Sequence, residues 1–474
     1  MMSNNVKWVS LIQAIKVFGQ MAFLFIVAAY LTPSQYALVA ILSTVSAFSL
    51  LIRDLGTSSS LIQRASLSDS IIDTVFTLNV ICGITVFLFL IFLSPYLSLY
   101  FKSDELKYLI YIMSFSFPIA SSTSIHVALM ERASKFYQVA QIEIFSFLIS
   151  MSLALAILIF YKTIYAVPIQ LLLYAIISSL FLFLKSRRKV KFELSAFHEI
   201  FSYSSHVTGF GVINFFSRNI DVIVIARILG GDYLGPYSLA YRIVLFPVQN
   251  ITTIVNRSFL PIMSRNVSNG VPNDVIYISS LKNIMYIVVP MMLGLILVRE
   301  EIVQLFFGDD WHLVSDIIVY LAFVGLIQSL VSTTGTIFMA YGKTKLLLIL
   351  GVLGTILHSF AFIVGANVDI FTLCKLYIAI SIVNAFICLE LALRSTGASL
   401  YMLLNSIYKP ILSGVFMYLI VILLSSIFED IVANNSNIVL FGFKVFVGVV
   451  SYVGAVFSLD KKTCLTYIEK FYAK

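Results

Sequence analysis

Residues 206–229 read HVTGFGVINFFSRNIDVIVIARIL, and apolar side chains dominate this stretch. An α-helix needs about twenty such residues to cross the hydrocarbon core of a bilayer, so the stretch predicts a transmembrane helix. Arg218 and Asp221 stand about halfway along it. A charge at that depth costs about 2.5–3.5 kcal/mol and normally faces protein or water rather than lipid. The stretch therefore predicts a membrane protein with a polar interior.

The composition of the whole chain agrees with this prediction. Of the 474 residues, 60% are hydrophobic and 11% are charged, whereas soluble proteins have about 45–50% and about 25%. Most Lys and Arg residues fall in short loops at span ends, where the positive-inside rule explains the net charge of +8 without nucleic acid. No Walker A, His-Glu-x-x-His, Gly-x-Ser-x-Gly or Cys-x-x-Cys pattern occurs, and the four cysteines lack metal-ligand spacing. The sequence predicts an all-α transporter rather than an enzyme.

Apolar windows of about twenty residues predict the remaining spans. Lys7 precedes the first window directly, so we expect that window to be a retained anchor rather than a cleaved signal. Lys and Arg concentrate in alternate loops, which predicts that both termini are cytoplasmic. We expect fourteen transmembrane helices, at 11–31, 37–56, 73–94, 106–130, 140–160, 164–184, 206–229, 237–260, 279–299, 313–340, 346–366, 370–393, 409–428 and 438–458.

An internal repeat divides these spans. Residues 20–31 align without a gap on 218–229, and the Ser-Thr-Ser triplet at 122–124 aligns on Ser-Thr-Thr at 332–334, with Lys135 on Lys345. Because each repeat holds six spans, an even number, the two halves share one orientation, as in many transporters whose lobes enclose a central cavity. We expect a six-helix lobe at 1–185, a basic amphipathic cytoplasmic linker at 186–205, a second six-helix lobe at 206–395, and two extra helices with a cytoplasmic tail at 396–474.

Charged residues within the spans are the candidate site. Arg218 and Asp221, spaced i, i+3, share a helix face, where they either line the cavity or form a structural ion pair. For cations nearer span ends, the alternative is that the long side chain reaches the membrane surface, and we assign Lys282, Lys444, Arg227 and Lys375 to that class. The predicted substrate-binding residues are Lys16, Arg53, Arg218, Asp221, Arg242 and Arg257; Glu143 and Asp221 are candidates for coupling to H⁺ or Na⁺, and no catalytic residue, metal or other cofactor is expected.

Several motifs resemble a known family. The chain is similar to the Wzx-type polysaccharide flippases, near the colanic and teichuronic acid exporters, within the superfamily that includes multidrug and toxin extrusion transporters. The first loop departs from the family pattern, because Tyr36-Ala37 replaces a glycine-containing turn. The resemblance rests on RNID at 218–221, ILG at 228–230, GPYSLAYR at 235–242, NRSFLPIMSR at 256–265, DLG at 54–56, LIQR at 61–64 and GDDW at 308–311.

This resemblance implies movement of undecaprenyl-diphosphate-linked oligosaccharide from the cytoplasmic to the outer leaflet of the bacterial inner membrane, by alternating access. The product is O-antigen, capsule or exopolysaccharide, and the implied partners are membrane lipids, a polymerase and a chain-length regulator. Cations in a wet cavity suit a diphosphate. Three alternatives stay open: a peptidoglycan-precursor flippase, an ion-coupled drug exporter of the same fold, and a polymerase or ligase, which the short outer loop at 300–312 disfavours.

Overall fold

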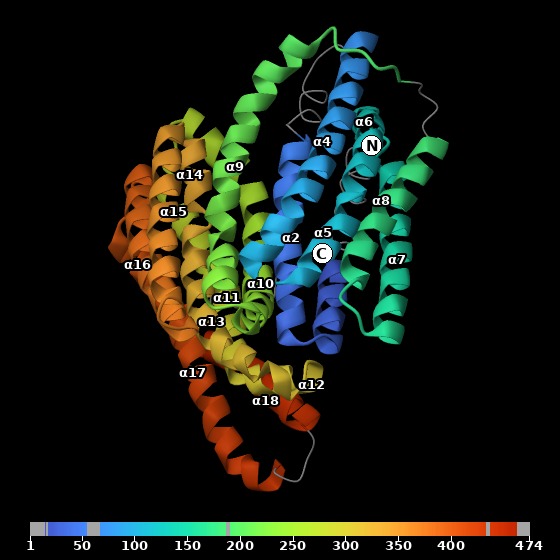
Figure 1. The fold of residues 1–474 in the computed structure, drawn as a ribbon. Coiled ribbons are helices and arrows are strands. Elements are labelled where there is room, and N and C mark those ends of the chain that lie inside the picture. Colours follow the sequence, from blue (N-terminus) through green and yellow to red (C-terminus); the bar gives the residue numbers. More distant parts are fainter. Residues whose placement is uncertain (1–14, 16–17, 55–66, 186–189, 433–436, 462–474) are drawn as a thin grey trace. The chain divides into compact units, whose positions relative to one another are not determined.

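The computed structural model describes residues 15, 18–54, 67–185, 190–432 and 437–461 (Figure 1). Throughout those ranges every regular element is a helix, as predicted. A short apolar helix, Phe18–Tyr30, comes first. It is followed by α2 (Pro33–Asp54), α4 (Asp69–Phe101), α5 (Asp104–Ser114), α6 (Ser116–Arg132), α7 (Phe136–Tyr161), α8 (Ala166–Lys185), α9 (Phe197–Ile228) and α10 (Gly231–Ser268).

The second half continues in the same way. Its helices are α11 (Asp274–Leu297), α12 (Arg299–Phe306), the 3₁₀ turn η1 (Asp309–Trp311), α13 (His312–Val331), α14 (Thr334–Ala340), α15 (Thr344–Ala366), α16 (Ile370–Thr396), α17 (Leu400–Val432) and α18 (Asn437–Leu459).

The helices match the predicted spans, two of which are interrupted. A helix covers most of each predicted window in the part of the chain that the structure describes, and α5 with α6, like α13 with α14, forms one span with a break. Within that part, eleven helices are long and apolar enough to cross a membrane. Phe18–Tyr30 is shorter, and α9 and α10, which carry the charges discussed above, fall outside that set. The chain is a multi-pass membrane protein, and fourteen spans stay a prediction.

The chain forms two compact units, Met1–Gly235 and Pro236–Lys474. In the first, α4 packs on α6, α6 on α8, and α7 on α8; in the second, α11 packs on α13, α13 on α16, and α15 on α16. Spans three to six therefore pair in the same pattern as spans nine to twelve, which agrees with the repeat read from the sequence. The units separate inside α10, whereas the linker at 186–205 was defined by the repeat, and that lobe boundary stays a prediction.

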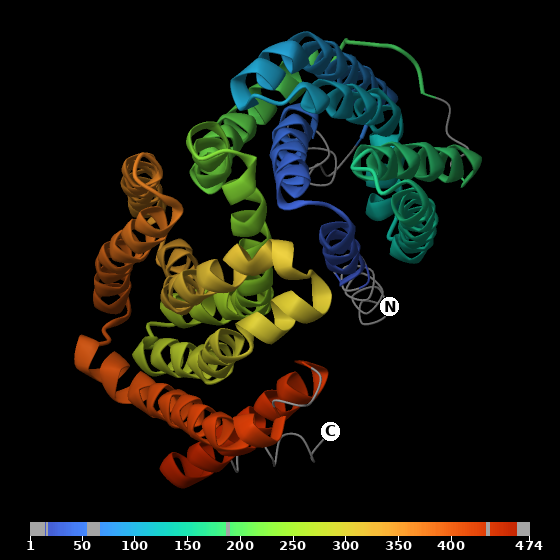
Figure 2. The same ribbon diagram turned by 60° about the horizontal axis from the view of Figure 1, so that its bottom comes forward.

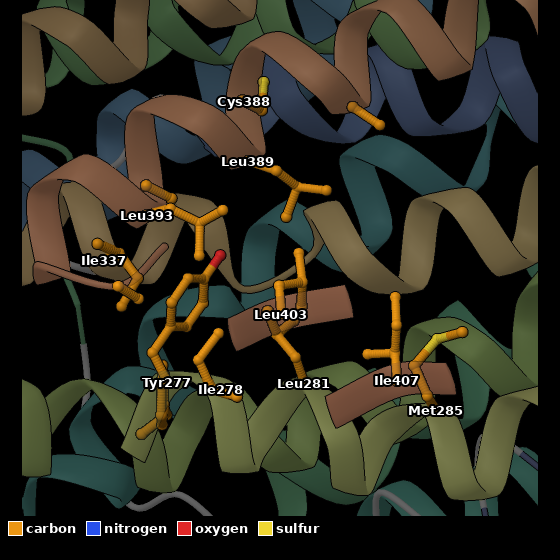
Figure 3. Close-up of a cluster of buried hydrophobic side chains, with 14 of the residues drawn as sticks. Tyr277, Ile278, Leu281, Met285, Ile337, Cys388, Leu389, Leu393, Leu403 and Ile407 are labelled. Carbon is orange, nitrogen blue, oxygen red and sulfur yellow. The ribbon is translucent and has the colours of Figure 1, made fainter. Parts of the chain in front are cut away.

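The core of the second unit lies between α11 and the helices around it (Figure 3). Tyr277, Leu281 and Met285 project from one face of α11 at helical spacing and are almost fully buried. Leu393 of α16 and Leu403 of α17 pack against the same cluster. In Figure 2, α17 and α18 lie side by side, and α17 also packs on α11. The two helices after the second repeat are thus part of this unit.

Large apolar side chains also cover the outside of both units. Examples are Phe92 on α4, Phe160 on α7 and Phe446 on α18, each more than 60% exposed. In water such a surface would be an aggregation hazard, whereas hydrocarbon solvates it without cost. The pattern fits lipid as the solvent of this chain.

The part of the linker that the structure describes lies along α4. Residues 190–194 are not helical, and their backbone bonds to α4 side chains. The N–H of Lys191 donates to the Asp73 carboxylate (3.1 Å), and the N–H of Glu193 donates to the Thr77 hydroxyl (2.9 Å). The rings of Phe192 and Phe76 are 5.4 Å apart. These contacts hold the segment that precedes α9 against α4.

Candidate functional site

The helix pair α2 and α9 carries most of the charges predicted from the sequence in the first unit. Phe48 of α2 lies 5.1 Å from the ring of Phe215 on α9. One turn further along α2, Leu51 lies where a side chain at Gly211 would be, 2.8 Å from the position of its Cβ. Because the higher-numbered residue of α2 meets the lower-numbered residue of α9, the two helices run antiparallel and in close contact.

Arg218 and Asp221 differ in their surroundings, although they lie one turn apart on α9. The Asp221 side chain is only 6% exposed, and its carboxylate accepts a hydrogen bond from the Val222 N–H at 2.8 Å. The Arg218 side chain is exposed. Among the described residues no ion pair joins these two side chains, so the structural pair considered as an alternative above is not formed there. Arg218 is left as an exposed cation on α9, about halfway along the span predicted at 206–229.

The other predicted residues lie on several helices. Arg53 is half-buried in the last turn of α2, Glu143 is half-buried on α7, and Arg242 is half-buried on α10 in the second unit. Each of these three side chains has at least one polar, ionic or ring partner. Lys16 and the side chain of Arg257 lie outside the described residues. The structure thus brings Arg53, Arg218 and Asp221 onto one helix pair.

At the other end of this helix pair, side chains of the first unit form close polar contacts. The Arg227 guanidinium lies 4.8 Å above the Tyr100 ring and donates to the Tyr100 carbonyl at 2.7 Å. The Ser34 hydroxyl donates to the Asp232 carboxylate. Arg227 binds the last turn of α4, where unpaired carbonyls at a helix end attract a cation. Its predicted reach to the membrane surface stays a prediction.

Two more lysines that were assigned to the membrane surface prove to be ion-paired. The ammonium of Lys282 lies 2.6 Å from the Asp460 carboxylate. That of Lys444 lies 2.5 Å from Glu301 and 3.3 Å from the Leu297 carbonyl, to which it donates. The ion pairs were not predicted, because each partner is far away in the sequence, where no local pattern reveals it; a position of the two lysines near the membrane surface stays a prediction.

Asn256 is a residue in the quoted motifs whose role the sequence did not indicate. Its amide donates to the Ser332 carbonyl at 3.1 Å, and its oxygen accepts from Thr336 at 3.0 Å. Ser332 lies in the break between α13 and α14, and Thr336 lies in the first turn of α14. Asn256 therefore forms hydrogen bonds with the backbone and a side chain at the break between these helices. The Ser/Thr triplet at 332–334 was the feature of the sequence that could have indicated this break.

The described residues hold no group of three or more His, Cys, Asp or Glu side chains placed to bind a metal ion. Cys82, Cys374 and Cys388 are free thiols. The predicted site residues that the structure describes are cations and carboxylates on α2, α7, α9 and α10.

The sequence of this chain is similar to those of known proteins. Residues 26–316 match the family described as polysaccharide biosynthesis protein. The chain is 28% identical over 373 residues to the teichuronic acid biosynthesis protein TuaB of Bacillus subtilis, covering 77% of each chain. It is 24% identical over 369 residues to the lipopolysaccharide biosynthesis protein WzxC of Escherichia coli, covering 77% of this chain and 75% of WzxC.

Solved structures show the same fold. The lipid II flippase MurJ in an inward closed conformation superposes with a TM-score of 0.72 at 17% identity, over 96% of this chain and 99% of MurJ. An inward-facing multidrug resistance MATE transporter superposes with a TM-score of 0.60 at 14% identity, over 83% and 98%. At these identities the likeness concerns the fold alone.

Proposed function

The chain belongs to the family of polysaccharide biosynthesis proteins, whose match covers residues 26–316, and from that membership we propose that it is a lipid-linked oligosaccharide flippase. It moves undecaprenyl-diphosphate-linked repeat units from the cytoplasmic to the outer leaflet of a bacterial inner membrane, with both termini in the cytoplasm. The similarity to TuaB and WzxC, which are named for teichuronic acid and lipopolysaccharide biosynthesis, supports a surface polysaccharide as the end product.

The observation that carries the proposal is the exposed guanidinium of Arg218 on α9. If its face of α9 met lipid, the charge would cost about 2.5–3.5 kcal/mol or more. A water-filled transport path along this face would remove that cost, and the diphosphate of the substrate would give the guanidinium an anion to pair with.

The substrate has a polar part, the diphosphate and sugars, and an apolar part, the polyprenyl chain. The diphosphate and sugars need polar groups and water, while the polyprenyl chain is as apolar as the lipid that surrounds the units. Movement of one lobe against the other would then alternate access to the path. On this proposal the chain makes and breaks no covalent bond, so it is a transporter and not a polymerase or ligase.

The fold match to MurJ keeps a second candidate, a peptidoglycan-precursor flippase. A lipid-linked diphosphate is common to both substrates, so the charges do not separate them. A deletion strain separates them: we expect loss of a sole peptidoglycan-precursor flippase to stop growth, and loss of a polysaccharide flippase to leave viable cells that lack surface glycan.

The experiment is complementation of a deletion strain. We expect the wild-type gene to restore surface glycan, and Arg218→Gln to leave the lipid-linked precursor on the cytoplasmic side with glycan reduced about tenfold or more, the loss of one charged hydrogen bond. Arg394→Gln is the matched control, because Arg394 is 75% exposed and its ion pair among the described residues is a surface pair with Glu390. Full glycan in an Arg218→Gln strain with normal protein levels would refute the role of Arg218.

A further inference from the structure

A second group of cations lies in the second unit, where α11, α17 and α18 meet. Asp460 directly follows α18 and is only 7% exposed. Its carboxylate lies 2.6 Å from the ammonium of Lys282 on α11 and 3.5 Å from that of Lys409 on α17, and it accepts a hydrogen bond from Tyr286 at 2.8 Å. Two lysines from different helices thus converge on one buried carboxylate.

The two lysines do not share Asp460 equally. Lys282 and Tyr286 both approach the same carboxylate oxygen within hydrogen-bond distance. Lys409 is near the other oxygen at 3.5 Å and is 30% exposed. No hydrogen bond within the described part of the chain uses the Lys409 ammonium, which has three N–H donors. Lys409 therefore keeps donors for an acceptor from outside the unit.

The depth of Lys409 indicates which acceptor it meets. Before it, the first turns of α17 expose Tyr401 (75%) and Tyr408 (42%). After it, the helix continues into an apolar span. Tyrosines followed by an apolar run mark the boundary between headgroups and hydrocarbon. Lipid phosphates are the anions present at that depth.

Contacts other than that of Lys409 hold α17 and α18 against the rest of the second unit. Near the start of α18, Lys444 pairs with Glu301 of α12, and Asn437 donates to Gln304 at 2.9 Å. At the Asp460 end, Lys282 and Tyr286 already hold the carboxylate in place. Lys409 is thus an additional cation, held near Lys282 by a carboxylate that offsets the repulsion between them.

We propose that Lys409, held beside Lys282 by Asp460, forms a binding site for a lipid phosphate group in the leaflet predicted to be cytoplasmic. The phosphate is bound on the exposed side of Lys409, away from the buried carboxylate. If the proposed function holds, the ligand is the diphosphate of the lipid-linked substrate, held at the membrane surface before it is translocated. An anionic phospholipid has the same headgroup chemistry and is the second source.

The test is a binding measurement on the purified full-length protein, by native mass spectrometry with undecaprenyl diphosphate and with phosphatidylglycerol as separate probes. We expect Lys409→Gln to weaken binding about tenfold, the loss of one charged hydrogen bond, and Lys409→Arg to restore it. Lys345→Gln is the matched control, since Lys345 is an exposed lysine of the same unit, predicted to lie on the same membrane side. Size-exclusion profiles and melting temperatures verify that each variant is folded.

The outcomes separate the sources and the hypotheses. Stronger loss for undecaprenyl diphosphate than for phosphatidylglycerol assigns the site to the substrate, and equal loss assigns it to lipids in general. Unchanged binding of both probes by Lys409→Gln, or equal weakening by Lys345→Gln, would overturn the site. Because binding is measured without translocation, either result is independent of whether the protein is a flippase.

Discussion

At the scale of single residues, the charges inside this membrane protein fall into two kinds. Lys282 and Lys444 are ion-paired within the second unit at 2.6 and 2.5 Å, and Arg227 is fixed against Tyr100 in the first. Arg218 is exposed, with no ion pair to Asp221. Fixed charges of the first kind hold helices together, whereas an exposed charge such as Arg218 is suited to a ligand.

The ion pair of Lys444 with Glu301 allows a stability test of the first kind. The side chains are 18% and 5% exposed, so Lys444→Met leaves the Glu301 carboxylate buried without its cation. We expect a loss of about 3–5 kcal/mol in the free energy of unfolding, visible as a lower melting temperature in detergent. The double variant Lys444→Met with Glu301→Gln should recover most of it. If the single variant melts like the wild type, the pair contributes no stability.

At the scale of helices, glycine residues determine how closely two helices can approach. Gly235, in the second turn of α10, lies so close to Pro33 at the start of α2 that a Cβ would overlap the Pro33 carbonyl oxygen. Gly351 on α15 has open space around the same position. These two glycines separate the effect of close helix approach from that of helix propensity.

We therefore expect opposite results from two glycine-to-alanine changes. Gly351→Ala should raise the melting temperature slightly, because Ala is favoured over Gly in a helix by about 1 kcal/mol. Gly235→Ala should lower it, because backbone atoms must move apart by more than a side chain can absorb. Equal and positive shifts in both variants would show that α10 does not approach α2 as closely as described.

The cap of α16 makes a prediction about pH. The Thr372 N–H donates to the Asp369 carboxylate at 2.5 Å, and this hydrogen bond lowers the pKa of Asp369 below its usual value. A lowered pKa means that the cap stabilises the folded chain at pH above about 4, the unfolded pKa, and loses this contribution as the pH falls through the folded pKa.

The measurement is the melting temperature of wild type, Asp369→Asn and Asp369→Ala across that range. The advantage of wild type over Asp369→Ala should shrink on acidification. The advantage of Asp369→Asn over Asp369→Ala should stay constant, because the amide oxygen still accepts the bond and does not titrate. A wild-type advantage that does not change with pH would contradict the role of the charged carboxylate.

At the scale of the whole molecule, the sequence predicted what local patterns encode. Hydropathy windows located the helices, and the register of the Ser/Thr triplets predicted a repeat that agrees with matching helix pairs in both units. The pairs of Lys282 with Asp460 and of Arg227 with Tyr100 were missed, because each joins residues more than a hundred positions apart. The hydrogen bonds from the linker backbone to the side chains of Asp73 and Thr77 were missed for the same reason.

The central claim is that this fold transports a lipid-linked diphosphate with the help of an exposed cation on α9. The most direct measurement is translocation in proteoliposomes, following undecaprenyl-diphosphate-linked oligosaccharide from one leaflet to the other with purified wild-type, Arg218→Gln and Arg394→Gln proteins. We predict transport by wild type and Arg394→Gln and a rate at least about tenfold lower for Arg218→Gln. No transport above protein-free liposomes by wild type, or equal rates for wild type and Arg218→Gln, would contradict the account.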